Sequence, residues 1–147
     1  MSETSGHFDP SPFTLHHMGI AVPDLQPASE FYSKVMGLRL IAEPVEDPIQ
    51  KVRVCFLADA GRAQPCIELI CPLDDKSPVN GYLKKGIGAY HLCYEVNDIE
   101  SELAALQTKG CLIVSQPVPA VAFAGRKIAW VFTPTKHLLE LLEKRSA

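Results

Sequence analysis

The 147-residue sequence lacks several features that would assign it to a particular class of protein. It has no apolar run approaching the roughly 20 residues that a membrane-spanning helix requires. It also has no basic run of the kind that binds nucleic acid, and its formal net charge is -3. Its five cysteines form no Cys-x-x-Cys pair and stand within apolar runs, which is typical of buried thiols in a reducing compartment. We therefore expect a globular protein that binds neither nucleic acid nor membranes.

The N-terminal stretch of the sequence contains no lysine or arginine. The first such residue in the chain is Lys34. A secretory signal begins with basic residues before an apolar stretch, and a mitochondrial presequence is rich in arginine. We predict a cytoplasmic protein in which residues 1–13 form a flexible tail and residues 14–147 form a single domain.

An approximate internal repeat is the most informative feature that is present. Residues His17, Val22 and Asp24 recur at equal spacing as His91, Val96 and Asp98. Each motif leads into apolar residues at helical spacing. These are Ala28, Phe31, Tyr32 and Val35 in the first copy, and Ile99, Leu103 and Leu106 in the second. The expected helix starts are Asp24 with Pro27 and Asn97 with Glu100, and the expected ends are Gly37 and Gly110.

Three short β-type runs follow each predicted helix. They lie near Leu38–Ala42, Val52–Ala58 and Pro65–Cys71, and near Leu112–Ser115, Ile128–Thr133 and Leu138–Glu143. The sequence thus predicts an α+β fold of two tandem βαβββ modules, residues 14–72 and 89–143, joined by a linker of residues 73–88 with a short helix. One module leaves a sheet face and an edge unprotected. We therefore expect the modules to pair into a curved mixed sheet around a cleft.

Strand alternation directs four side chains into this cleft: His17, Glu68, His91 and Glu140. A glutamate inside a strand of Leu, Ile and Cys is costly to bury unless it is paired, and this anomaly occurs once in each module. Two imidazoles and two carboxylates form a donor set for a divalent ion. The sequence predicts a metal site at these four residues, but it does not distinguish Co, Ni, Mn, Zn and Fe.

The same alternation makes predictions for neighbouring residues. We expect Met18, Ile20 and Val22 to lie under the first helix, and His16 to face away from the cleft. His137 has the wrong parity for the metal. Small residues on the cleft side leave room for a ligand: Gly19, Ala21 and Cys93.

Several segments resemble known proteins. His17–Leu25 and Met36–Leu38 resemble the opening of vicinal-oxygen-chelate (VOC) superfamily proteins, so the predicted domain is a VOC domain. Pro72–Val79 and His91–Val96 resemble methylmalonyl-CoA epimerases, and the likeness extends over residues 14–143.

This resemblance implies metal ligands at His17, His91 and Glu140, with Glu68 in a fourth place where some members have glutamine. It implies proton abstraction beside a thioester carbonyl through a metal-stabilised enolate. We assign the catalytic acid–base roles to Glu140 and Glu68. The resemblance also implies a small-molecule substrate of the acyl-CoA thioester type and a homodimer.

Three segments depart from the epimerase pattern. Thr133–His137 is shorter than the usual loop, and Pro119–Arg126 replaces a glycine-rich stretch. Lys51–Phe56 lacks the carboxylate that some epimerases use as a second base. These departures concern the substrate more than the metal ligands.

Other functions of the superfamily therefore stay open. A glyoxalase-I-type lactoylglutathione lyase would use the same four ligands, and an enzyme acting on another acyl thioester or ketone is a further alternative. A metal-dependent oxygenase usually leaves one of the four positions without a ligand, and a small-molecule (antibiotic) binding protein typically lacks the ligands altogether. The segment between the modules favours the epimerase.

Overall fold

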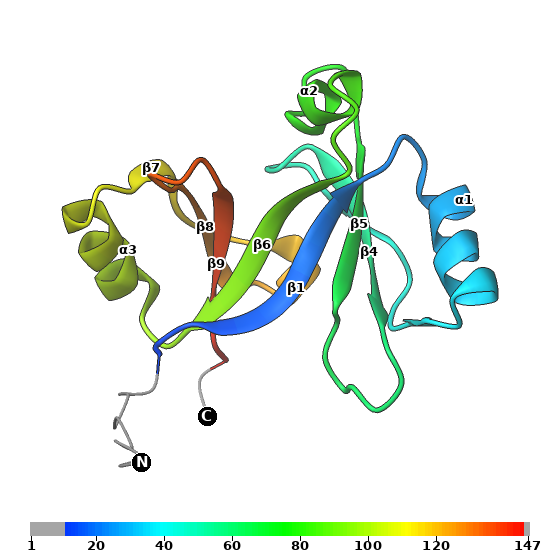
Figure 1. The fold of residues 1–147 in the computed structure, drawn as a ribbon, viewed down its shortest axis with the longest axis horizontal. Helices are drawn as coiled ribbons and strands as arrows, with labels where there is room; N and C mark the ends of the chain where they lie inside the picture. The colour runs from blue at the N-terminus through cyan, green and yellow to red at the C-terminus, as the bar shows by residue number, and fades with distance from the viewer. Residues whose placement is uncertain (1–10, 146–147) are drawn as a thin grey trace, which may run out of the picture.

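The computed structural model describes residues 11–145, and most of the predicted tail, residues 1–10, lies outside the described residues (Figure 1). The first half contains β1 (Thr14–Ala21), α1 (Leu25–Glu30), the π-helical turn η1 (Phe31–Val35), β2 (Arg39–Leu40), β3 (Val45–Asp47), β4 (Val52–Ala58) and β5 (Ile67–Pro72). The second half contains α2 (Val79–Lys84), β6 (Ala89–Val96), α3 (Ile99–Thr108), β7 (Leu112–Pro119), the 3₁₀ turn η2 (Val121–Phe123), β8 (Lys127–Phe132) and β9 (Leu138–Glu143).

The nine strands of residues 11–145 form one mixed sheet with the order β2-β4-β5-β1-β6-β9-β8-β7, and β3 pairs with β4. Strands β1 and β5 are parallel, as are β6 and β9, and the remaining pairs are antiparallel. The antiparallel pair β1–β6 joins the two halves at the centre of the sheet. The α+β fold with a curved sheet is thus confirmed, as is the short helix between the halves (Figure 1).

Strand β3 was not predicted, because three residues are too short to show an alternating pattern. Strand β7 extends to Pro119, beyond the predicted end at Ser115. Its alternation is obscured by two irregularities in the pairing with β8.

The helix ends confirm most of the start and stop signals. The carboxylate of Asp24 accepts a hydrogen bond from the Gln26 amide at 3.3 Å, and Gly37 and Gly110 adopt φ of 74° and 94° beyond the helices. The expected start of α3 at Asn97 is wrong. Asp98 is the N-cap, because its carboxylate accepts from the Ser101 amide at 3.0 Å.

The first helix does not keep the predicted apolar face. Ala28 and Tyr32 pack on the sheet, but Phe31 and Val35 are 50% and 70% exposed. The chain passes from α-helix to π-helix at Phe31, and the wider turn rotates the following side chains away from α-helical spacing.

Two apolar layers separate the outer helices from the sheet. Helix α1 packs on β4 and β5, and α3 packs on β7, β8 and β9. Ile20 and Val22 belong to the α1 layer, as predicted. Met18 does not, since it is 40% exposed. The short helix α1 lies over the neighbouring strands β4 and β5 and leaves the start of β1 uncovered.

A third cluster fills part of the concave side of the sheet, where residues of both halves meet. It includes Ala21, Val54, Phe56, Ile70, Cys93, Phe123, Ile128 and Leu142. The predicted cleft is therefore narrower than the strand pattern alone implies. Among the described residues, no helix is both long and apolar enough to span a bilayer.

Candidate metal centre

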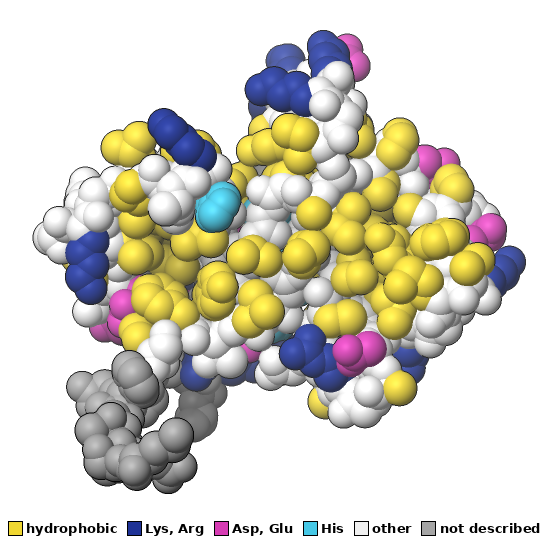
Figure 2. Space-filling model, in the orientation of Figure 1, with side chains coloured by type: hydrophobic (Ala, Val, Ile, Leu, Met, Phe, Trp, Pro, Cys, Tyr) yellow, Lys and Arg dark blue, Asp and Glu magenta, His cyan; other side chains and the backbone are white. Residues whose placement is uncertain are grey.

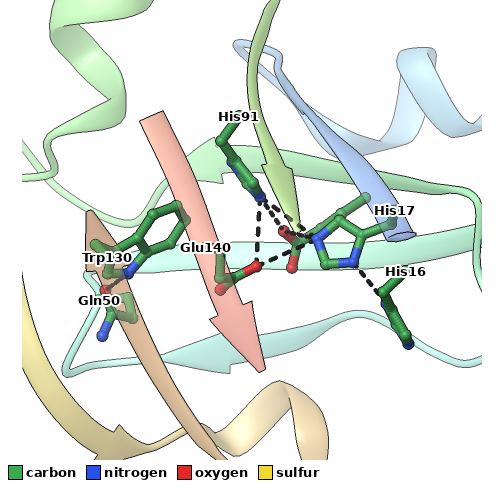
Figure 3. A network of polar contacts seen from close by, with 7 residues as sticks. His16, His17, Gln50, His91, Trp130 and Glu140 are labelled. Atoms are coloured by element: carbon green, nitrogen blue, oxygen red, sulfur yellow. Dashed lines mark hydrogen bonds and ion pairs between the residues drawn. The ribbon is translucent and has the colours of Figure 1, made fainter. Parts of the chain in front are cut away.

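Four adjacent strands at the centre of the sheet each supply one side chain to a buried polar cluster. His17 comes from β1, Glu68 from β5, His91 from β6 and Glu140 from β9. One donor atom from each of the four residues lies within 4.8 Å of the others. All four side chains are at least nine-tenths buried. Figure 3 shows His17, His91 and Glu140 pointing toward one another. The structure therefore brings together the four residues that the sequence analysis predicted.

The strand register explains this convergence. Gly19 is aligned with Glu68 on one side and His91 on the other, while Cys93 is aligned with both His17 and Glu140. The four donors therefore occupy two neighbouring rows on one face of the sheet. Each half of the molecule supplies one imidazole and one carboxylate.

Gly19 makes room for the ring of His91. A Cβ atom at Gly19 would lie 2.0 Å from Cε1 of His91, so no larger residue is compatible with this ring position. The expectation that small cleft-side residues leave space for a ligand is thus wrong for Gly19, whose space is filled by protein. Ala21 and Cys93 likewise belong to the packed core.

His16 does not face away from the cleft, contrary to the alternation. The register between β1 and β6 slips between Leu15 and His17, which makes His16 an extra residue on β1. The bulge turns His16 to the same side as His17, and their Nδ1 atoms are 2.7 Å apart. His16 is buried and packs edge-on against Phe123. A bulge of this kind depends on the partner strand and leaves no signal in the local sequence.

The distances within the cluster fit a shared cation. Nε2 of His17 lies 3.2 Å from Oε1 of Glu68 and 3.3 Å from Oε1 of Glu140. Nε2 of His91 lies 3.5 Å and 3.4 Å from the same two oxygens, and 3.4 Å from Nε2 of His17. Four donors about 2.1 Å from a tetrahedral ion would be about 3.4 Å apart. Oε1 of Glu140 also has no hydrogen-bond partner despite these close neighbours, as expected of an atom that binds a cation.

The electrostatics of the metal-free cluster favour charge on all four groups. Burial opposes the charged form of His17, but Glu68 and Glu140 outweigh it and raise its pKa to about 9. The same carboxylates raise the pKa of His91. Burial by itself would raise the pKa of both glutamates, yet the imidazoles hold these pKa values below their usual range. A cation would take the place of the imidazolium protons, so metal binding would release protons.

An apolar cavity of about 270 Å³ adjoins the two glutamates. Residues of both halves line it, and the indole Nε1 of Trp130 on β8 donates to Oε1 of Gln50 in the β3–β4 turn at 3.2 Å (Figure 3). The sequence analysis missed this contact and the lining residue Asp47, because both depend on the unpredicted strand β3. His137 lines a separate hollow beside Met18 and Leu92 and does not join the four donors.

Comparison with known proteins agrees with this fold. The sequence model of the Glyoxalase/Bleomycin resistance protein/Dioxygenase superfamily matches residues 16–130. The chain is 33% identical over 134 residues to the mitochondrial methylmalonyl-CoA epimerase of Dictyostelium discoideum, covering 88% of this chain and 78% of that one. It is 32% identical to the ethylmalonyl-CoA/methylmalonyl-CoA epimerase of Cereibacter sphaeroides, covering 80% and 86%.

Similarity to a solved structure extends over nearly the whole chain. The methylmalonyl-CoA epimerase of Mycobacterium tuberculosis superposes with a TM-score of 0.81 at 30% identity, covering 96% of this chain and 95% of that one. The chain therefore belongs to the Glyoxalase/Bleomycin resistance protein/Dioxygenase superfamily, which is the vicinal-oxygen-chelate superfamily that the sequence resembles. The predicted cytoplasmic location stays a prediction.

The space that Gly19 provides can be tested directly. Gly19→Ala forces the buried ring of His91 to move, so we expect a loss of about 1–3 kcal/mol in the free energy of unfolding, measured by chemical denaturation. Gly81→Ala on α2 is the matched control, because nothing lies within 4 Å of its added Cβ. A Gly19→Ala variant as stable as the wild type would show that His91 does not occupy this position.

Proposed function

We propose that this protein is a metal-dependent isomerase of the epimerase type, which removes and returns the proton beside the carbonyl of an acyl-CoA thioester. The observation that carries the proposal is the buried cluster of two imidazoles and two carboxylates beside an apolar cavity. Relatives named as epimerases at 32% and 33% identity support it.

A divalent ion fits the donor set of this chain. His17 and His91 would bind it through Nε2, and Glu68 and Glu140 through their carboxylates. Nitrogen and oxygen donors of this kind suit Co, Ni, Mn, Zn and Fe alike. When bound, the ion supplies Lewis acidity, which lowers the energy of the charge that develops on a carbonyl oxygen.

The proton transfers are assigned to the two glutamates. Glu140 takes the proton as the C–H bond breaks, and the electron pair moves to the carbonyl oxygen as an enolate. Glu68 approaches from β5, on the other side of β1 and β6, and returns a proton to the opposite face of the carbon. The neighbouring imidazoles hold both carboxylates ionised, so Glu140 can accept the proton directly. Glu68 takes up a proton from solvent before it delivers one to the carbon, and Glu140 releases its own proton to solvent at the end of the cycle.

Among the described residues that line the cavity, Asp47 is the other carboxylate that could serve as the second acid–base group. Val52 and Val54 line the cavity from β4, the strand in which this sequence lacks the carboxylate that some epimerases use as a second base. Asp47 also lines it, but its Oδ1 already accepts hydrogen bonds from the Ile49 and Gln50 amides at 3.0 Å. Glu68 therefore stays the assignment for the face opposite to Glu140.

A glyoxalase-I-type isomerase is the second candidate function. The four donors that we assign to an epimerase would serve it equally well, because its reaction also begins with proton removal beside a carbonyl. Proton–deuterium exchange in D2O, followed by NMR, separates the two functions. Methylmalonyl-CoA and the glutathione hemithioacetal of methylglyoxal are the two probes.

Glu140→Gln tests the catalytic assignment. The amide keeps an oxygen donor but accepts no proton, so we expect the exchange rate to fall by about 10²–10⁴-fold while one metal ion per chain is still bound at saturating concentration. Bound metal is measured by elemental analysis and exchange by NMR.

Glu143→Gln at the end of the same strand is the matched control, since Glu143 contacts the Ile99 amide and stands outside the four-donor cluster. Near wild-type exchange in the Glu140→Gln variant would refute the assignment. Failure of the wild-type protein to bind Co, Ni, Mn, Zn or Fe would favour a metal-free binding protein instead.

We also propose that two copies pair through the outer side of β1 and β6. Hydrophobic side chains gather there between α1 and α3 (Figure 2), and Leu15, Met18 and Ile87 are 48%, 40% and 39% exposed. Apolar surface of this kind marks interaction sites on soluble proteins.

Light scattering tests this pairing. We expect twice the chain mass of 16.1 kDa for the wild type and the single mass for Met18→Lys, because a buried lysine would lack a partner in the interface. Ala104→Lys on the exposed side of α3 is the control. A wild-type protein of single mass at all concentrations would contradict the proposal.

A further inference from the structure

The cavity beside the four-donor cluster is lined mainly by apolar side chains, with Gln50, Tyr82, Tyr90 and Ser115 as neutral polar residues of its lining. Its apolar walls come from β4, β5, η2 and β8, and include Val54, Ile70, Ala122, Phe123, Ile128 and Trp130. Its charged lining residues are three carboxylates: Asp47, Glu68 and Glu140. In the described part of the chain, no lysine or arginine lines this cavity.

The basic side chains on the surrounding elements pair with other groups or lie in solvent. Arg126 follows η2, and its Nη2 atom lies 2.8 Å from Oε2 of Glu95. Its Nε atom donates a hydrogen bond to the Glu143 carbonyl. Lys127 is 3.0 Å from Glu100 at the surface. Arg53 alternates with Val52 and Val54, so it lies on the other face of β4 and is exposed. None of these cations reaches the cavity to receive an anionic substrate group.

This charge balance disfavours a free carboxylate on the reacting part of the substrate. A divalent ion offsets the charges of Glu68 and Glu140, and Asp47 then leaves the cavity with a net negative charge. A substrate carboxylate would add a second uncompensated charge to an apolar enclosure, which is costly. Two neutral carbonyl oxygens avoid this cost, since only the enolate is then charged.

The size of the cavity indicates a substituent larger than methyl. A volume of about 270 Å³ exceeds the roughly 150 Å³ of an apolar protein cavity that binds benzene. Small side chains at Ala120 and Ala122 keep this space open on the η2 side. A methyl group would leave most of the apolar wall without a contact.

We infer that the substrate is a neutral 1,3-dicarbonyl thioester whose reacting carbon bears a bulky apolar group, of the 2-substituted 3-oxoacyl class. This inference rests on the proposed function, because it takes the same glutamates to move the proton. The apolar group packs between Val54, Ile70 and Ile128, and the dicarbonyl oxygens lie toward the four-donor cluster.

Three CoA thioesters test the inference in the metal-loaded protein: methylmalonyl, 2-methylacetoacetyl and 2-benzylacetoacetyl. Enzyme-catalysed proton–deuterium exchange at the reacting carbon is measured above the uncatalysed rate. We expect kcat/KM for the benzyl compound to exceed that of each methyl compound by at least about 10-fold. Equal or faster exchange of methylmalonyl-CoA would overturn the inference.

Trp130 provides a second measurement that needs neither metal nor turnover. It is the single tryptophan of the sequence and lines the cavity, so its fluorescence reports occupancy. In metal-free protein we expect 3-benzyl-2,4-pentanedione to bind at least about 10-fold more tightly than benzylmalonate, which has the same apolar group on two carboxylates. Tighter binding of benzylmalonate would refute the charge argument.

Ala122→Phe tests the size argument, because the added ring fills the cavity. We expect this substitution to lower the ratio of kcat/KM for the benzyl compound to kcat/KM for the methyl compounds at least about 10-fold. The exposed Ala104→Phe on α3 is the control. Unchanged selectivity would overturn the size argument. Fluorescence selectivity without exchange of any thioester would contradict the proposed function while supporting the nature of the cavity.

A second inference rests on a different observation, the bulge that brings His16 beside His17. With Nε2 of His17 in the four-donor cluster, its Nδ1 carries the ring proton and donates it to Nδ1 of His16 across 2.7 Å (Figure 3). We propose that His16 is a positioning residue, which fixes the ring orientation and tautomer of His17 for metal binding. Hydrogen bonds of this type to metal-binding histidines strongly influence metal affinity.

Two substitutions of equal size separate hydrogen bonding from packing. His16→Asn retains an oxygen that accepts from Nδ1, whereas His16→Leu does not. We expect the leucine variant to bind Co²⁺ about 10–100-fold more weakly and to alter its visible absorption, and the asparagine variant to stay within a few fold of wild type. Equal affinity of the two variants, with both folded by circular dichroism, would overturn the proposal.

Discussion

The contact between β1 and β6 is the constraint on which the site depends. These strands are the innermost of the two halves, and their antiparallel register sets His91 beside Gly19 and His17 beside Cys93. The parallel strands β5 and β9 then bring one glutamate to each side. A slip of one residue in the central pair would turn one of the two imidazoles to the outer face and leave the two buried carboxylates with a single imidazole between them.

Burial raises the free-energy cost of the charged groups in the cluster, and it also strengthens the attraction between them. Two carboxylates among aliphatic side chains are tolerated because imidazoles surround them, and the mutual attraction raises the pKa of His17 to about 9. A cation in place of the imidazolium protons would satisfy the same carboxylates. The stability of the sheet therefore depends on positive charge beside Glu68 and Glu140.

The apolar cavity gives the cluster its chemical context. Side chains of both halves enclose it, and the Trp130–Gln50 hydrogen bond ties β8 to the β3–β4 turn at its edge. In such surroundings charge on a bound molecule is disfavoured away from the four-donor cluster. The fold is shared with a methylmalonyl-CoA epimerase, so a difference in substrate would arise from the residues that line this cavity.

The sequence by itself determined the duplicated βαβββ order and the four cleft-facing donors, because strand alternation and a repeated buried glutamate are local signals. It also indicated the ends of the first helix through Asp24 and Gly37. Only the tertiary structure decided that His16 turns inward, that the His91 ring occupies the space above Gly19, and that Trp130 meets Gln50. These features depend on register between strands that are distant in the chain, and such pairing leaves no trace in the alternation of either strand alone.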